Sequence, residues 1–308
     1  MTTVSVIIPT FNNAARLPDC IRSVISQSGD FRLETIIVND GSTDTTAGII
    51  SEYQKAYPGT IKVISQQNRG QSTARNHALD IASGHWIVFV DADDRLLPGA
   101  ISHLLHVATA LSAPITCGTF VRREKAASAT RSQEIAAVDS YTAIGTLLYQ
   151  TDPRLNSSLW GKIFSRHLFD GLRLWDGHIY EDLDIMPRLF LRASAIALTT
   201  ANVYLYQHNP HSTLSVWSDR RKDMLEVVSR IIAIPEIAAD RALTRAAQDR
   251  AFSAACNCLL NMILNNDRDR TTHRRCLDII RSTAPLTLRN SRARLKNRLA
   301  ALLLSLLP

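Results

Sequence analysis

Four short apolar runs, each followed by a polar turn, organise the first 90 residues of the chain. The runs are Val4–Ile8, Thr35–Val38, Ile61–Ile64 and Trp86–Val90. They are rich in β-branched and aromatic residues, which is typical of strands that are covered on both faces in a parallel sheet. The pattern therefore predicts four buried strands.

Helical periodicity separates these strands. After the first run, Leu17, Ile21 and Val24 recur at the spacing of one helix face. Similar faces follow the second and third runs, formed by Ile49, Ile50 and Tyr53, and by Ala74, Ala78, Ile81 and Ala82. Strands that alternate with helices over about the first 110 residues predict an α/β fold with a doubly wound, mostly parallel sheet and helices on both faces.

The chain from about Val216 onward has helical periodicity throughout. Its apolar positions recur as Met224, Val227, Val228 and Ile231, and then as Phe252, Cys256, Leu259, Leu260 and Ile263. We therefore expect a helical C-terminal region after the α/β part.

Polar residues follow every predicted strand. They are Thr10 to Asn12, Asp40 with Asp44, Arg69 with Arg75, and Asp91 with Asp93. Each group alone could be a turn, a helix cap or a surface charge. Because ligands of such sheets bind beyond the carboxyl ends of the strands, their joint occurrence predicts a nucleotide site at this edge.

Asp91, Ala92 and Asp93 end the last of these strands. Alternate residues of an extended chain point the same way, so the two carboxylates can face one ligand. Like charges held close together need a cation, and oxygen ligands favour Mn²⁺ or Mg²⁺ over zinc. The alternative is a solvated acidic loop, because the three-residue pattern is short.

Four motifs occur in order along the chain, namely Val6–Asn12, Val38–Asp44, Ser72–Asn76 and Val90–Asp94. Together they resemble the inverting glycosyltransferases of family 2, which have the GT-A fold, and the resemblance covers about residues 3–215. It implies a glycosyltransferase domain over residues 1–215, with a nucleotide-binding half at 1–110 and an acceptor half at 111–215. The helical region then occupies residues 216–308.

The resemblance also implies roles for single residues. Pro9, Thr10, Phe11 and Asn12 would contact the nucleoside or ribose, Asp40 the uracil edge, and Arg75 the diphosphate. Asp93 would bind the metal directly, while Asp91, with Ala92 beside it, would contact the ribose or a metal-bound water. Asn13 and Ala14 stand where many relatives carry Glu.

The same resemblance places the catalytic base at Asp182, with Glu181 orienting it or binding the acceptor. A base is required because an alcohol attacks only as its proton is removed. Pro187 suits the first turn of the helix that follows, so both acids are expected in the loop that leads into it. The alternative is that these acids only complement the helix dipole.

Two further segments resemble parts of this family's site. Trp160 could stack on a sugar, or belong to the core, and Lys162 could fix the acceptor loop. In the loop after the last strand, His208 or Gln207 stands where many relatives have an arginine that reaches the diphosphate.

Composition limits the class of protein. Hydrophobic residues make up 45% and charged residues 20% of the 308 residues, which indicates a globular protein. The five cysteines form no CxxC pair, so we expect a reducing cytoplasm rather than a disulfide framework. The first predicted strand begins too early for a signal peptide, and no apolar run is long enough to span a bilayer.

Basic charge is concentrated towards the C-terminus. The first 120 residues contain 8 basic and 10 acidic residues, and the remainder contains 27 and 18. Five basic residues lie between Arg289 and Arg298, ahead of a leucine-rich end. This segment could lie on an anionic membrane, or pack on its own domain or on a second copy of the chain. No nucleic-acid recognition motif accompanies the charge, so we do not expect nucleic-acid binding.

The sequence as a whole predicts a cytoplasmic, metal-dependent inverting glycosyltransferase, with a peripheral position at the membrane if the tail binds lipid. The donor would be a UDP-sugar, and the acceptor a lipid-linked or surface-polysaccharide glycan. A sugar-nucleotide-forming nucleotidyltransferase is a second hypothesis, although no glycine precedes Gly29 to form its phosphate loop. A binding protein that has lost catalysis is a third.

Overall fold

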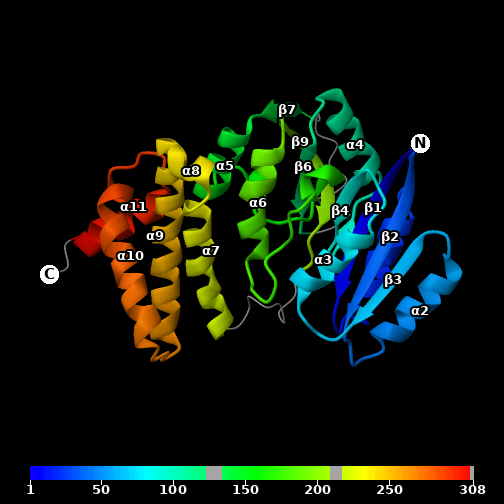
Figure 1. Ribbon diagram of the computed structural model, residues 1–308, viewed down its shortest axis with the longest axis horizontal. Coiled ribbons are helices and arrows are strands. Elements are labelled where there is room, and N and C mark those ends of the chain that lie inside the picture. The colour runs from blue at the N-terminus through cyan, green and yellow to red at the C-terminus, as the bar shows by residue number, and fades with distance from the viewer. Residues whose placement is uncertain (123–133, 209–216, 306–308) are drawn as a thin grey trace. The chain divides into compact units, whose positions relative to one another are not determined.

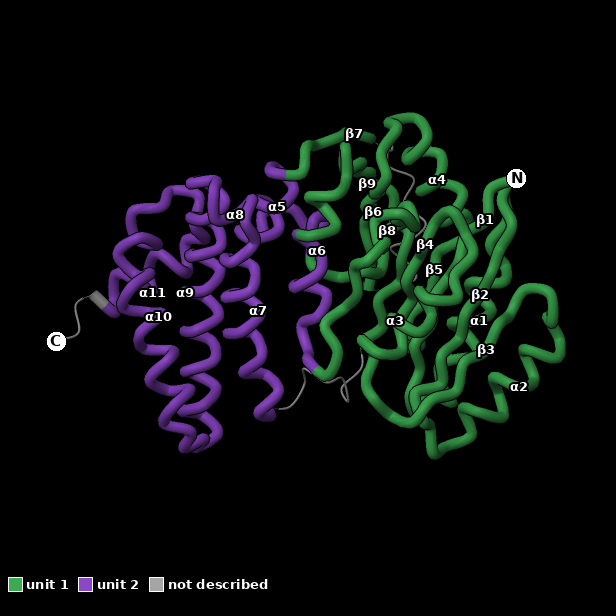
Figure 2. The backbone as a smooth tube through the Cα atoms, viewed as in Figure 1, with its two compact units in different colours: residues 1–140, 157–177, 188–209 green, residues 141–156, 178–187, 210–308 purple. Residues whose placement is uncertain are grey.

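The computed structural model describes residues 1–122, 134–208 and 217–305. The chain divides into two compact units (Figure 2). Unit 1 comprises residues 1–140, 157–177 and 188–209, and unit 2 comprises residues 141–156, 178–187 and 210–308. The predicted domain boundary at residues 215 and 216 lies outside the described residues.

Unit 1 contains a nine-stranded sheet whose first half is parallel (Figure 1). The strands in this half, in spatial order, are β3 (Ile61–Gln66), β2 (Phe31–Asp40), β1 (Thr2–Thr10) and β4 (Trp86–Phe89). In the register, Ile7 lies beside Ile36 of β2 and Phe89 of β4. Since all four strands run in one direction, their polar ends meet at one edge of the sheet.

The second half of the sheet is mixed. Its strands are β8 (Lys162–Ser165), β6 (Ile115–Val121), β9 (Ile196–Leu205), β5 (Arg95–Leu96) and β7 (Ile135–Val138). Strand β8 lies between β4 and β6 and is antiparallel to both, whereas β6 and β9 are parallel. The sheet is therefore parallel from β3 to β4 and mixed beyond β4.

Four helices of unit 1 follow the parallel strands. They are α1 (Leu17–Ile25), α2 (Thr46–Ala56), α3 (Gln71–Ile81) and α4 (Ala100–Ala110). Leu17, Ile21 and Val24 of α1 are fully buried and share one core with the alternate strand residues Val4 and Val6. Helix α3 packs against β1, β2 and β3, so its N-terminus lies near the polar ends of those strands.

Unit 2 is helical, as the sequence pattern predicts. Its helices are α5 (Ser140–Tyr149), α7 (Asp223–Ile232), α8 (Pro235–Ala239), α9 (Arg241–Leu264), α10 (Arg270–Leu288) and α11 (Leu295–Ser305). Helix α6 (Glu181–Arg192) begins in unit 2 and ends in unit 1. Short 3₁₀ turns occur at Pro153–Leu155, Arg166–Phe169 and Asp219–Lys222. Phe252 of α9, Cys276 of α10 and Ala301 of α11 belong to one core.

Not every apolar position on these helix faces is buried. Ile81, Leu260 and Ile263 fit the apolar periodicity of their helices but are exposed. Each lies near the C-terminal end of its helix. No helix among the described residues is long and apolar enough to cross a membrane.

Candidate active site

The loops that follow β1 and β2 are joined by hydrogen bonds. The Asn12 N–H donates to Ser42 Oγ over 3.0 Å, and Asn12 Oδ1 accepts from the Thr43 N–H over 2.8 Å. Asn12 has a φ of 47°, a left-handed conformation that asparagine tolerates better than most residues. Two of the predicted motifs thus form one rigid edge.

Asp40 fixes the turn that leads into α3. Its carboxylate accepts hydrogen bonds from Gln66 Nε2 at 2.7 Å and from the backbone N–H groups of Arg69 and Gly70, both at 2.8 Å. The side chain is buried. Each carboxylate oxygen can accept two hydrogen bonds, so these contacts leave acceptor capacity for a base edge.

Gly41 allows this turn to form. Its φ is +75°, and a Cβ atom there would lie 2.7 Å from the backbone nitrogen of Asn68. Any side chain would therefore push the β2 loop away from the loop before α3.

Residues Asp91–Asp94 after β4 form an acidic turn that contains an ion pair. Arg75 Nη2 lies 2.8 Å from Asp91 Oδ1, and the arginine side chain is only 5% exposed whereas that of Asp91 is 31% exposed. Arg75 comes from the first half of α3 and Asp91 directly follows Val90. The sheet edge therefore brings together the third and fourth predicted motifs, with the guanidinium neutralising one of the two carboxylates.

Asp94 lies beneath this turn and is buried. Its Oδ2 accepts from the Tyr204 hydroxyl at 2.9 Å, and its Oδ1 accepts from the Gln207 N–H at 2.7 Å. Burial, and then the charge of Asp91, raise the pKa of Asp94 to about 8, although both hydrogen bonds act against this rise. Asp94 therefore ties the acidic turn to the end of β9.

The acidic turn suits a divalent cation that is shared with a substrate. Asp91 and Asp93 are both half-buried and offer only oxygen ligands. Both oxygens of Asp94 are already engaged. Among the described residues no group of three or more histidine, cysteine or acidic side chains could hold a metal by itself. Mg²⁺ and Mn²⁺ in such sites take one or two carboxylates and complete their coordination with phosphate and water, which fits this donor set.

The predicted nucleoside contacts at the end of β1 differ in exposure. Pro9 and Thr10 are buried, and Thr10 Oγ1 has no hydrogen-bond partner within the described residues. Phe11 is exposed despite its large apolar ring. Ala92 is buried, and His208 is exposed, with its carbonyl oxygen accepting from Arg16 Nη2 at 3.3 Å.

Trp160 belongs to an aromatic cluster next to the acidic turn. Its ring stacks on Tyr204 with centroids 4.7 Å apart and meets Phe120 edge-on at 5.0 Å. Lys162 is buried, and its Nζ donates to the Ser158 carbonyl oxygen at 2.7 Å. Trp160 therefore stacks on the tyrosine whose hydroxyl group contacts Asp94. Lys162 holds the loop that carries Trp160.

Glu181 and Asp182 form the first turn of α6 rather than the preceding loop. The expected position was wrong because Tyr180, with a φ of 64°, ends the loop and its carbonyl accepts from the Leu183 and Asp184 N–H groups. Asp182 Oδ1 accepts from the Leu183 N–H at 2.7 Å. Glu181 is buried and Asp182 is half-buried. Pro187 consequently lies inside the helix.

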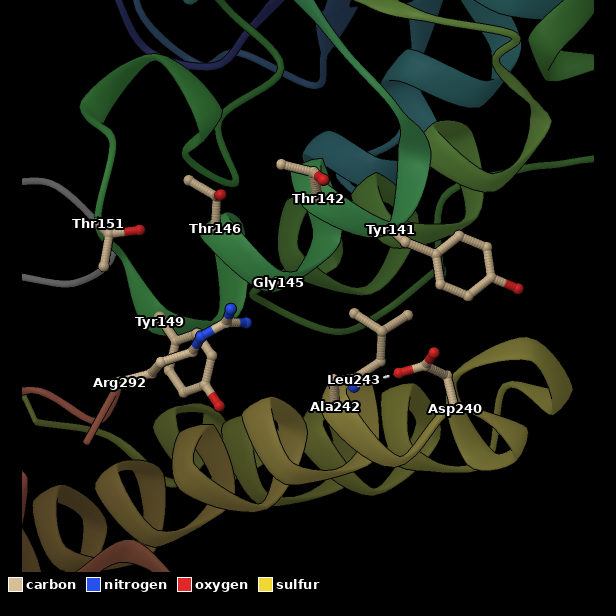
Figure 3. A pocket seen from close by; sticks show the side chains of 10 residues that line it. All are labelled: Tyr141, Thr142, Gly145, Thr146, Tyr149, Thr151, Asp240, Ala242, Leu243 and Arg292. Carbon is tan, nitrogen blue, oxygen red and sulfur yellow. Dashed lines mark hydrogen bonds between the residues drawn. The ribbon is translucent and has the colours of Figure 1, made fainter. Parts of the chain in front are cut away.

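Unit 2 also contains a cavity of about 500 Å³ between α5 and the start of α9 (Figure 3). Its polar lining consists mainly of hydroxyl groups, together with Arg292 and Asp240. The Asp240 carboxylate caps α9 by accepting from the Leu243 N–H at 2.8 Å. None of the predicted site residues lines this cavity.

The sequence did not identify Tyr204 as a site residue. It lies in β9, and its hydroxyl contacts Asp94, 110 positions away along the chain. No local signal predicts this contact, because it depends on the pairing of β9 with β6 and β5.

Comparisons with known proteins give a consistent result. The family description Glycosyl transferase family 2 matches residues 5–169, more than half of the chain. Glycosyltransferase GlyA of Streptococcus pneumoniae is 28% identical over 227 residues, which are 70% of this chain and 32% of GlyA. The chain thus matches about a third of the length of that relative.

Two solved structures are similar in fold. A crystal structure of S. aureus TarS in complex with UDP-GlcNAc has a TM-score of 0.70 at 20% identity, covering 92% of this chain and 83% of that one. The mannosyltransferase PcManGT of Pyrobaculum calidifontis, in complex with GDP-Man and Mn²⁺, has a TM-score of 0.54 at 15% identity, covering 97% of this chain and 84% of that one. The predicted fold class is confirmed.

Proposed function

The chain belongs to glycosyl transferase family 2, and from this membership we propose that it moves a sugar from a UDP-linked donor to a hydroxyl group of a lipid-linked or surface-polysaccharide acceptor. It is a glycosyltransferase, which excludes the second hypothesis of a sugar-nucleotide-forming nucleotidyltransferase. Sugar, acceptor, metal and stereochemistry are parts of the proposal.

The observation that carries this proposal is the ion pair between Arg75 and Asp91 at the carboxyl edge of the sheet. The hydrogen-bonded loops of Asn12 and Asp40 surround the same edge in unit 1. A UDP-sugar needs a cationic group for its diphosphate and a polar cleft for its nucleoside. TarS, which has this fold, binds UDP-GlcNAc, and this favours uridine over other nucleosides.

Donor residues have separate roles in this proposal. Exposed Phe11 stacks on the base, and Asp40 accepts a hydrogen bond from its edge. The hydroxyl of Thr10, which has no partner in the described part of the chain, binds a polar group of the nucleoside. Asp93 and Asp91 would hold Mn²⁺ or Mg²⁺, and the cation would neutralise charge on the departing diphosphate. PcManGT, a protein of the same fold, is complexed with Mn²⁺.

The proposed reaction is a single displacement. The acceptor hydroxyl oxygen attacks the anomeric carbon, and Asp182 accepts the hydroxyl proton. The bond between the anomeric carbon and the phosphate oxygen breaks, and its electron pair leaves with UDP. Arg75 stabilises the charge that develops on the diphosphate. Configuration at the anomeric carbon inverts, because attack and departure occur on opposite sides.

Helix α11 supports a peripheral position on an anionic membrane. Leu295, Leu299 and Leu303 recur every four residues and are exposed, although Ala301 of the same helix is buried in the core of unit 2. Lys296 adds an exposed cation beside this leucine stripe. A helix with an apolar stripe and flanking basic residues suits the interface of an anionic bilayer.

The test is a turnover assay with a panel of UDP-, GDP- and TDP-sugars in the presence of Mn²⁺. Slow hydrolysis of one UDP-sugar, which releases UDP, is the expected result. Asp93→Ala should remove it, whereas Asp30→Ala, which changes an exposed acid of unit 1, should not. If a GDP- or TDP-sugar alone is hydrolysed, the uridine assignment is wrong.

A further inference from the structure

Unit 2 contains a second cavity, of about 210 Å³, that is strongly basic. Four cationic residues line it, namely Arg221, Arg250, Arg294 and Lys296. None of the described residues in the lining is acidic. A concentration of positive charge in a concave site attracts anions, and the more so when the walls exclude water.

Arg250 contributes a half-buried guanidinium to the lining. Its Nε is buried, and within the described residues no atom accepts a hydrogen bond from it. Arg230 of the same unit offers a contrast, because its guanidinium pairs with Asp184 over 2.8 Å. A buried donor without an acceptor is costly, and an anion bound in the cavity would supply that acceptor.

The charged groups near Arg250 also favour a bound anion. Burial, and then the charge of Arg294, lower the pKa of the Arg250 guanidinium from its ordinary value, while Asp182 and Tyr180 act in the opposite direction. An additional anion beside Arg250 would therefore relieve both unfavourable effects. Asp182 is close enough for its charge to act on Arg250, so the proposed base and this cavity belong to one region of unit 2.

The remaining walls are suited to a ligand with an apolar part. Trp217 and Met224 line one side, and the Arg221 guanidinium lies over the Trp217 ring at 5.8 Å. Arg294 donates to Gln150 Oε1, which fixes its guanidinium in the lining. Ser253 and Tyr180 add hydroxyl groups.

We propose that this cavity binds a phosphate or diphosphate group of the acceptor substrate. The inference rests on the proposed function, in which the donor diphosphate has its own site at Arg75. A phosphate with several ionised oxygens matches a cluster of guanidinium groups better than a single carboxylate does. An acceptor held here by its phosphate brings its hydroxyl groups near Asp182, and this selects phosphorylated or lipid-diphosphate acceptors over neutral glycans.

The experiment is a calorimetric titration of the full chain with inorganic diphosphate in the presence of EDTA. The chelator removes the metal on which binding at the donor site depends. Arg250→Met should weaken diphosphate binding roughly tenfold or more, because a charge-assisted pair of hydrogen bonds is lost. Arg241→Gln, an exposed position on the same helix, should bind as the unchanged protein does. Equal affinity of Arg250→Met and the unchanged protein would overturn the proposal.

A thermal melt without ligand separates a binding role from a structural one. Arg250→Met should melt at the same temperature as the unchanged protein or higher, because it removes a buried N–H group that has no acceptor within the described residues, and it should no longer be stabilised by diphosphate. A clear drop in melting temperature that Arg241→Gln does not share would show a structural role and overturn the proposal.

Farnesyl diphosphate compared with inorganic diphosphate identifies the source of the phosphate. Tighter binding of the farnesyl compound, lost in Arg250→Met, supports the site and assigns it to a lipid-linked acceptor. Equal affinities, also lost in Arg250→Met, support the site and assign it to a phosphorylated glycan. Both measurements are independent of turnover, so a protein that binds diphosphate but hydrolyses no UDP-sugar would retain this inference and lose the proposed function.

Discussion

The Tyr204 hydroxyl donates a hydrogen bond to Asp94 Oδ2 over 2.9 Å and accepts one from the Asp91 N–H over 3.1 Å. One side chain of β9 thus sets the position of both the buried and the half-buried acid of the turn. The position of the acidic turn therefore depends on β9, a strand far along the chain, as well as on the backbone of the turn itself.

Tyr204→Phe tests this support. The change leaves the buried Asp94 carboxyl group one hydrogen bond short, which should cost roughly 1–3 kcal/mol of the free energy of unfolding. It should also weaken metal-dependent binding of the donor, because the backbone at Asp91 loses its acceptor. Urea unfolding and donor titration measure the two effects. Tyr57→Phe, at an exposed tyrosine of unit 1, is the matched control and should change neither.

Asp93→Ala tests the metal role. We expect donor affinity to become independent of Mn²⁺, because one of two carboxylate ligands is missing and the other is paired with Arg75. Donor titration with and without EDTA measures this. Should Asp93→Ala retain the same EDTA-sensitive affinity as Asp30→Ala, the cation lies elsewhere.

Asp182→Asn tests the base. Donor affinity should remain nearly unchanged, whereas transfer to an acceptor should fall by roughly 10²- to 10⁴-fold. Single-turnover transfer and donor titration on the same preparation separate the two quantities. Asp278→Asn, at an exposed position on α10, serves as the control. Turnover of Asp182→Asn within a few-fold of that control would assign the base to another residue.

Glu34 gives unit 1 a pH-dependent component of stability. Burial opposes its ionisation, but hydrogen bonds from Lys62, Ser5 and Ser83 prevail and lower the pKa of Glu34 from 4.5 to about 2. A lowered pKa in the folded protein means that this stability is present above pH 4.5 and is lost as the pH falls towards 2.

Glu34→Gln should therefore lower the free energy of unfolding by about 2 kcal/mol at pH 7 and by less at pH 3. Urea unfolding at the two pH values measures the difference. Glu52→Gln, at an exposed position of α2, should show no such change. A constant difference between Glu34→Gln and the unchanged protein at both pH values would contradict the assignment.

The leucine stripe of α11 predicts lipid binding. Leu299→Gln combined with Leu303→Gln should reduce flotation with anionic vesicles, because each change removes exposed apolar area from the helix. Leu260→Gln combined with Leu264→Gln, at exposed leucines of α9, is the control and should float as the unchanged protein does. Equal flotation of the two double variants would exclude α11 as the membrane contact.

Local patterns predicted the four parallel strands well. The runs Val4–Ile8 and Trp86–Val90 correspond to β1 (Thr2–Thr10) and β4 (Trp86–Phe89), and the predicted family is confirmed. Buried parallel strands carry their signal in consecutive residues, so the sequence is sufficient there. Because these strands run in one direction, the motifs at their ends meet at one edge of the sheet.

Long-range relationships could not be predicted in the same way. The insertion of β8 between β4 and β6, and the hydrogen bond from Tyr204 to Asp94, join residues far apart along the chain. Arg250 reads as one more arginine in a helical segment, and only the packing of unit 2 reveals that its Nε is buried without a partner.

The position of β8 has a consequence for synthesis of the protein on the ribosome. Strand β4 ends at Phe89 and its neighbour β8 begins at Lys162, so about 70 residues must be translated before the hydrogen-bonding edge of β4 can be filled. At roughly 5–20 residues per second, that edge stays open on the nascent chain for several seconds. Open edges of apolar strands pair with other chains. Chaperone demand during expression should therefore peak while residues 90–160 emerge, and slower translation of that stretch should lower the soluble yield.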